Sequence, residues 1–143
     1  MIATVSGKIT HKSPEFLIVD VHGIGYKIIV PLSTYYKLPE INNPVFLYTY
    51  THVREDALML FGFLTRDEKD IFERLIGVSQ IGPKLAVNIL SGITAQELKE
   101  AIAKGDIVKL ISIPGIGRKT AERITLELRD KIEFTFEGSQ PSA

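Results

Sequence analysis

The chain has 143 residues, of which 45% are hydrophobic and 24% charged, the balance of a globular protein made of one ordinary domain or two very small ones. Its 17 basic and 17 acidic side chains cancel to a net charge of zero, so any surface for an anionic partner has to be a local patch. The absence of cysteine excludes disulfides and thiolate metal sites.

The N-terminal segment has no basic stretch followed by an apolar run, and no apolar stretch approaches the roughly 20 residues that span a bilayer. We therefore expect a cytoplasmic protein without a signal peptide or a transmembrane segment. Two domains of about 65 residues each would be marginally stable alone, so mutual packing or oligomerisation is favoured.

Residues 1–63 have the pattern of short β-strands. Five runs rich in β-branched and aromatic residues alternate with turns that contain Gly, Pro or Asn. The runs are 2–10, 16–21, 26–30, 45–51 and 57–63. Five strands in so short a segment fit a small closed barrel of the OB type better than an open sheet, because closure removes exposed edges. The sequence therefore predicts an α+β protein whose first domain, residues 1–64, is a five-stranded barrel.

After the last strand run, apolar residues recur at helical spacing. Capping boxes at 65–68 and 94–97 mark two helix starts, since a threonine side chain there accepts from the backbone N–H three residues later. Pro83 fits the first turn of another helix, and Gly105 fits the end of a helix. The predicted units of this half are a helical domain, residues 65–135, and a flexible linker, residues 136–143.

The helical half contains an internal repeat. The segment Ile81-Gly-Pro-Lys-Leu-Ala86 matches Ile116-Gly-Arg-Lys-Thr-Ala121 at a spacing of 35 residues. Each copy follows an apolar helical segment, 71–76 before the first and 107–111 before the second, and the last helix is expected to run from Arg118 to about Lys131. Helix, tight glycine turn and helix in this order are typical of a helix-hairpin-helix unit.

The glycine turns have a specific chemistry. Glycine adopts φ > 0 and lets a ligand approach without a Cβ in the way. Each turn enters a helix start, where the first backbone N–H groups are unpaired and the helix dipole is positive, so the turn is suited to bind a phosphate. The lysine two residues after the glycine adds charge, and the preceding isoleucine, Ile81 or Ile116, is expected to anchor the turn in the core. Contacts of this kind read the DNA backbone and not the bases.

Other uses of glycine-rich turns fit less well. Neither copy follows a β-strand within a βαβ unit, which argues against a dinucleotide site, and no segment reads G-x-x-x-x-G-K-[ST], so nucleotide hydrolysis by a P-loop is not predicted. One alternative is that the turns are purely structural and the chain is a protein-interaction module. Another is a nuclease or glycosylase that uses helix-hairpin-helix units to grip DNA, although no clear active-site acid or lysine lies beside the second turn.

Two acidic residues, Glu55 and Asp56, lie between the fourth and fifth predicted strands. Three interpretations stay open: a solvated hairpin tip, part of a metal-dependent nuclease site, or carboxylates that repel phosphates. A nuclease site would need more converging carboxylates, and no D-x-D motif completes one. The histidines His11, His22 and His52 lack metal-ligand spacing, so neither a metal nor a cofactor is predicted.

Taken together, these segments resemble the RuvA family, the Holliday-junction-binding subunits of the bacterial branch-migration machine. The resemblance covers the chain through about residue 135. It is carried by Gly23-Ile-Gly-Tyr26, Thr51-His-Val-Arg-Glu-Asp-Ala57, Leu60-Phe-Gly-Phe63, Ile81-Gly-Pro-Lys-Leu-Ala86, Ile89-Leu-Ser-Gly92 and Leu110-Ile-Ser-Ile-Pro-Gly-Ile-Gly-Arg-Lys-Thr-Ala-Glu-Arg123.

The resemblance implies a non-catalytic subunit that binds four-way DNA junctions and holds them open for branch migration in recombination and DNA repair. It implies a homotetramer, leaves open whether tetramers pair into an octamer, and names the ATP-driven motor RuvB and the resolving nuclease RuvC as partners. Glu55 and Asp56 match the family's acidic pin near the junction centre. The implied DNA-binding residues are Gln80, Ile81, Gly82, Lys84, Gly115, Ile116, Gly117, Arg118, Lys119 and Arg123.

Two features depart from the family pattern. The first hairpin has Gln80 where the family usually has glycine, and a glutamine adopts the left-handed conformation only at a cost, so we expect this hairpin to be strained or to sit farther from the phosphate. The family's third domain, a small helical bundle that contacts the motor, follows a flexible linker. The chain ends at Ala143 within a segment that resembles that linker, and we therefore expect it to lack the motor contact.

Overall fold

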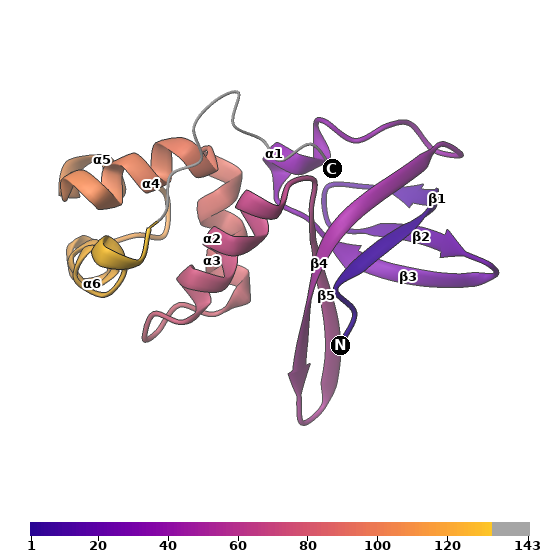
Figure 1. Ribbon diagram of the computed structural model, residues 1–143, viewed down its shortest axis with the longest axis horizontal. Helices are drawn as coiled ribbons and strands as arrows, with labels where there is room; N and C mark the ends of the chain where they lie inside the picture. Colours follow the sequence, from indigo (N-terminus) through magenta and orange to yellow (C-terminus); the bar gives the residue numbers. More distant parts are fainter. Residues whose placement is uncertain (133–143) are drawn as a thin grey trace.

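A computed structural model describes residues 1–132, so the predicted linker at 136–143 lies outside the described residues. A β-barrel forms one half of the molecule and a group of short helices forms the other (Figure 1). Within the described part of the chain, none of the helices is long and apolar enough to cross a membrane.

Five strands close into a barrel in the order β1-β2-β3-β5-β4. They are β1 (Thr4–Lys12), β2 (Leu17–Val21), β3 (Ile24–Ile29), β4 (Pro44–Arg54) and β5 (Ala57–Phe63). Among these five strands of residues 1–132, β3 and β5 pair in parallel and the other pairs are antiparallel. All five predicted strands are present, and the predicted closed barrel is confirmed. Its interior is filled by fully buried aliphatic side chains, among them Ile9, Leu17 and Ile28.

One barrel glycine is required by a close backbone approach. A Cβ added to Gly7 would lie 2.3 Å from the carbonyl oxygen of Asp20, where β1 crosses β2. Any larger residue would force the two strands apart, so this position fixes how tightly the barrel closes.

The sequence pattern does not predict the short helix α1 (Leu32–Tyr35), which lies between β3 and β4 in the chain. This helix contacts the helical half through hydrogen bonds. The Leu32 amide donates to the Ser91 hydroxyl at 2.9 Å, and the Ser33 hydroxyl donates to the Leu90 carbonyl at 2.7 Å. Four residues are too few to show a helical period in a sequence, and long-range contacts of this kind stabilise the turn.

The helical half consists of α2 (Arg66–Ile76), α3 (Pro83–Gly92), α4 (Ala95–Lys104), α5 (Ile107–Ile111), α6 (Arg118–Leu128) and the 3₁₀ turn η1 (Arg129–Lys131). Both predicted capping boxes form, because the side chains of Thr65 and Thr94 each accept from the amide three residues later at 3.1 Å. Gly105 ends α4 in the left-handed conformation, with φ of 66°. The predicted end of the final helix is corrected from about Lys131 to Leu128, because the last turn tightens into a 3₁₀ helix.

The two halves share an aromatic core. The ring of Phe72 on α2 lies 5.4 Å from the ring of Phe61 and 4.8 Å from the ring of Phe63, both on β5. The ring of Tyr50 on β4 lies 5.6 Å from the Phe72 ring. Because Phe61, Phe63 and Phe72 are all fully or almost fully buried, the expected mutual packing of the halves is present.

We predict that Phe72→Ala lowers the free energy of unfolding by about 3–5 kcal/mol, the usual cost of a large cavity in a core. The loss should appear in urea unfolding followed by circular dichroism. Val108→Ala is the control, because Val108 is 80% exposed on α5. A loss of less than about 1 kcal/mol for Phe72→Ala would contradict the shared core.

Candidate nucleic-acid interface

The two predicted hairpins have nearly the same backbone geometry. The N-cap of α3, Gly82, has φ of −93° and ψ of 177°, and the N-cap of α6, Gly117, has φ of −91° and ψ of 179°. Two residues earlier in each hairpin the backbone is left-handed, with φ of 71° at Gln80 and 92° at Gly115. The internal repeat is therefore a structural repeat. Gln80 adopts the left-handed conformation, which agrees with the first of the two expectations, a strained first hairpin.

The isoleucine in each turn anchors it as predicted. Ile81 and Ile116 are each only 4% exposed and belong to the same hydrophobic core. Their amides donate to the carbonyls of Val78 and Ile113, both at 3.1 Å. One buried side chain and one backbone hydrogen bond thus hold each turn from the core side. Neither contact covers the side of the turn that faces away from the core.

The backbone amides that follow each turn are unpaired. The first bonds that tie α3 and α6 to their turns run from Ala86 to the Gly82 carbonyl and from Ala121 to the Gly117 carbonyl, and neither N-cap has a side-chain partner. Within residues 1–132, no acceptor is found for the N–H groups of Gly82, Lys84, Leu85, Gly117, Arg118, Lys119 and Thr120. Such helix starts are sites where an anion binds to amides and to the positive end of the helix dipole.

Glycine at the two N-cap positions is not required by the protein itself. A Cβ added to Gly82 or Gly117 would meet no atom within 4 Å, and both residues have an extended backbone that any amino acid adopts. Gly115 differs, because its φ is 92° and a Cβ there would lie 3.0 Å from Leu85 Cδ1. The open side of Gly82 and Gly117 therefore leaves room for a ligand that approaches the backbone closely.

The predicted cations have different surroundings. Lys84 and Lys119 are exposed, and no ion pair within the described residues includes either one. Arg118 Nε lies 3.1 Å from Glu122 Oε1, an exposed pair on one helix face that is weak enough to exchange for a phosphate. Arg123 instead donates from Nη1 to the Ser79 carbonyl at 3.4 Å, so it contacts the first hairpin from the second helix-hairpin-helix unit.

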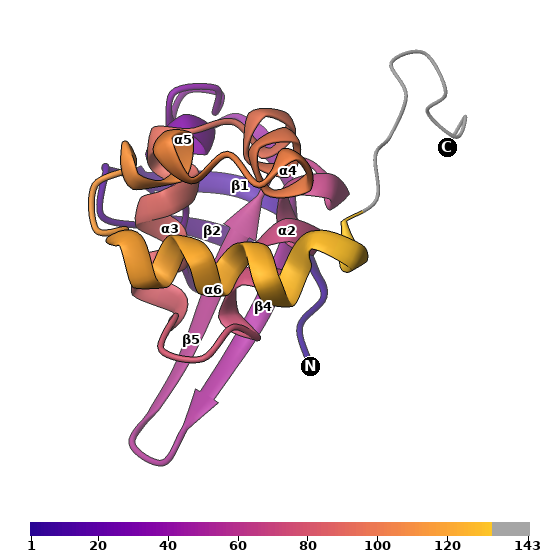
Figure 2. The ribbon, with the colours of Figure 1, turned by 90° about the vertical axis from the view of Figure 1, so that its left-hand side faces the viewer.

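The acidic pair lies at the end of a long arm. Strands β4 and β5 continue beyond the barrel as a two-stranded hairpin, and Glu55 and Asp56 form its turn between the paired residues Arg54 and Ala57. Both acidic residues are exposed. The tip of the arm and the loop between α2 and α3 lie on the same side of the molecule in both views (Figures 1 and 2).

A groove of about 1090 Å³ connects the arm with the two hairpins. Its lining includes His52 and Arg54 from the arm, and Gly82, Lys84 and Gly115 from the hairpins. The structure therefore brings residues from three distant segments to one depression. The sequence pattern alone does not identify His52 and Arg54 as residues of this groove. Strand alternation could have indicated that they share a face, since residues two apart on a β-strand point to the same side.

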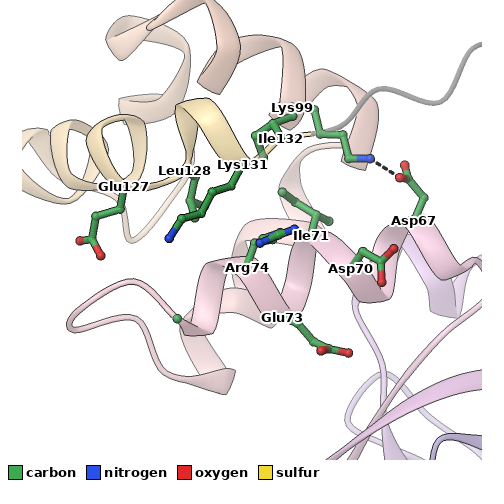
Figure 3. A pocket seen from close by; sticks show the side chains of 11 residues that line it. Asp67, Asp70, Ile71, Glu73, Arg74, Lys99, Glu127, Leu128, Lys131 and Ile132 are labelled. Atoms are coloured by element: carbon green, nitrogen blue, oxygen red, sulfur yellow. Dashed lines mark hydrogen bonds and ion pairs between the residues drawn. The ribbon is translucent and has the colours of Figure 1, made fainter.

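A second cavity of about 500 Å³ lies between α2, α4 and the end of α6 (Figure 3). Its lining is mixed in charge, and Lys99, which is only 4% exposed, pairs with Asp67 there. None of the turn residues 80–84 or 115–119 reaches it. Among residues 1–132, no group of three or more histidine, aspartate or glutamate side chains is arranged to hold a metal ion. We therefore assign the cavity no part in the interface.

The fold and the site define a class: a closed five-stranded OB-type barrel followed by tandem helix-hairpin-helix units with open, matched turns. The chain matches the family described as "RuvA N terminal domain" over residues 1–62 and the one described as "SAM-like Helix-hairpin-helix tandem" over residues 72–130.

Curated relatives extend the match over nearly the whole chain. It is 56% identical to the "Holliday junction branch migration complex subunit RuvA" of Geotalea daltonii, over 96% of this chain and 69% of the relative. Proteins of the same name from Trichlorobacter lovleyi and Solibacter usitatus are 54% and 51% identical, over 99% and 100% of this chain and 70% and 72% of the relatives. The chain belongs to the RuvA family.

The two glycines of the second hairpin should respond differently to alanine. Gly115→Ala should lower the free energy of unfolding by about 1–2 kcal/mol, because an alanine in the left-handed region is strained. Gly117→Ala should change it by less than about 0.5 kcal/mol, since the poorer N-cap is offset by a less flexible unfolded chain. Thermal and urea unfolding would measure both, and equal losses would contradict the proposed distinction.

Proposed function

We propose that this chain binds four-way DNA junctions through the backbone phosphates of their duplex arms and keeps the junction open for branch migration. It acts by binding and catalyses no reaction itself. The proposal extends to the chain what the names of its relatives say of them, that they are subunits of the Holliday junction branch migration complex.

The observation that carries the proposal is the pair of matched turns. Two helix starts offer unpaired amides on a side that glycine leaves open at Gly82 and Gly117, and exposed lysines at 84 and 119 stand next to them. Two phosphate sites in one rigid domain suit two phosphates of a single duplex. Because amides and lysines read no bases, the binding should not depend on sequence.

The acidic arm supports a junction as the substrate and argues against a plain duplex. Exposed carboxylates at Glu55 and Asp56 repel phosphates over about 8–10 Å at physiological ionic strength. They would oppose a duplex running straight past the tip. At a junction the strands part, and carboxylates at the centre would keep the separated phosphates away from each other.

The assembly and its partners follow from the family resemblance. We propose a homotetramer that surrounds one junction, with an arm from each subunit at the centre, RuvB as the motor of the complex and RuvC as the resolving nuclease. The resemblance assigns the contact with RuvB to the family's third domain, so we propose no residue of this chain for it. We further propose residues 1–64 and 65–135 as the two domains of the subunit. We propose the bacterial cytoplasm as its location, because the proposed substrate arises there in chromosomal recombination and repair.

We predict that a gel shift gives at least tenfold tighter binding to a four-way junction than to linear duplex of the same total length. Affinity should fall steeply with salt, with a slope in log K against log salt of about −0.9 for each neutralised phosphate. Equal affinity for the two DNAs would contradict junction recognition. Cleavage of labelled junction in magnesium would instead favour a nuclease.

Gly117→Ala tests the phosphate site without disturbing the fold. The added Cβ projects into the space that a phosphate would occupy, so junction affinity should fall about tenfold, or roughly 1.4 kcal/mol. Fluorescence anisotropy with labelled junction would measure it. Leu126→Ala on the same helix is the matched control, because Leu126 is 83% exposed and remote from the turn in sequence. Unchanged affinity for Gly117→Ala would argue against backbone contacts at this turn.

A further inference from the structure

Each helix-hairpin-helix unit contacts the other at or next to its turn. Arg123 on α6 donates to the carbonyl of Ser79 in the first hairpin, 44 residues earlier in the chain. In return, Gly115 in the second hairpin lies so close to α3 that a Cβ would meet Leu85 Cδ1 at 3.0 Å. The relative position of the two turns is therefore set by direct contacts as well as by their common core.

The two turns differ in how well their own residues fix them. At the repeat spacing, Ser79 and Gln80 of the first hairpin correspond to Pro114 and Gly115 of the second. Proline fixes φ, and glycine adopts the left-handed region at no steric cost, so the second turn is preorganised. Ser79 has no such restraint, and Gln80 has φ of 71°, a conformation that is costly for a residue with a Cβ.

Arg123 donates its hydrogen bond to the first turn, which is the less preorganised of the two. The accepting carbonyl belongs to Ser79, directly before the left-handed Gln80. At the repeat spacing, Arg123 corresponds to Asn88 on α3, and within the described residues the Asn88 side chain makes no hydrogen bond to the second hairpin. Within the described residues, the side-chain hydrogen bond between the two turns thus runs from the preorganised unit to the strained one.

We propose that Arg123 is a positioning residue for the first phosphate site: its guanidinium holds the Ser79 carbonyl and keeps the Ser79–Gln80 turn in the conformation that presents the unpaired amides of Gly82 and Lys84. The inference rests on the proposed function, and it replaces the simpler expectation that Arg123 binds a phosphate directly. Lys119, in the first turn of the same helix and without an ion pair among residues 1–132, keeps the direct role.

Salt dependence separates the two roles. A cation that neutralises a phosphate releases a counterion, and its removal lowers the salt slope of binding by about 0.9. A residue that only positions a turn lowers affinity at every salt concentration and leaves the slope unchanged. We expect Arg123→Ala to weaken junction binding about three- to tenfold, in line with one exposed, charge-assisted hydrogen bond, without a change in slope. Lys119→Ala should weaken binding and reduce the slope.

Gln80→Gly provides a second, independent readout. Glycine removes the strain of the left-handed position, so the turn should hold its conformation without the contact from Arg123. In the Gln80→Gly background, Arg123→Ala should therefore cost less than about twofold, whereas Lys119→Ala should cost as much as in the original chain. The four affinities form a double-mutant cycle that isolates the coupling between residues 80 and 123.

The experiment is fluorescence anisotropy with a labelled four-way junction and a linear duplex, at several salt concentrations, on the full chain and these variants, with melting temperatures measured in parallel. Absence of a junction preference in the unaltered chain would overturn the proposed function. If that preference holds, a reduced slope for Arg123→Ala would overturn the positioning role. An equal loss for Arg123→Ala in the original chain and in the Gln80→Gly background would overturn it as well.

Discussion

The structure depends on a simple constraint on backbone amides. A helix always begins with N–H groups that have no partner inside the helix, and these groups need an acceptor from elsewhere. In α2 and α4 a threonine side chain supplies the acceptor at the N-cap. In α3 and α6 the N-cap is glycine, which supplies none and also leaves the space in front of the amides open. The same domain thus supplies a side-chain acceptor at the N-caps of α2, α4 and α5, and it keeps the starts of α3 and α6 available.

The other features of the fold hold these two helix starts in place. Buried isoleucines draw each turn against the common core, and the helices α2 and α5 bring the chain to the turns from inside the domain. The aromatic contacts of Phe72 with β5 then attach the barrel to the same core. Because the arm is a continuation of β4 and β5, this packing also determines where Glu55 and Asp56 lie relative to the hairpins. In the proposed function, attraction of phosphates at the hairpins and repulsion at the arm act at these fixed positions. Their fixed geometry would make the binding selective for DNA structure.

Local patterns in the sequence predicted much of this arrangement. Strand alternation, the capping boxes and the isoleucine, glycine and lysine of each hairpin involve residues at most a few positions apart, and the corresponding elements are present. Features that depend on distant contacts could not be predicted. The helix α1 is stabilised by Ser91, the groove joins segments from both halves, and the contact of Arg123 with Ser79 crosses 44 residues. Sequence also could not separate the roles of Gly115 and Gly117, since only the backbone angles and the neighbouring atoms reveal that the first is required by the fold and the second is not.

The most direct test of phosphate binding by the free amides is hydrogen exchange of the two turns with and without a four-way junction. The amides of Gly82, Lys84, Leu85 and residues 117–120 have no protein acceptor in the described part of the chain and should exchange rapidly in the free protein. Saturating junction should slow exchange in both segments, while the buried strands of the barrel stay unchanged. Tight junction binding without protection of either segment would contradict the central claim that these amides hold the DNA backbone.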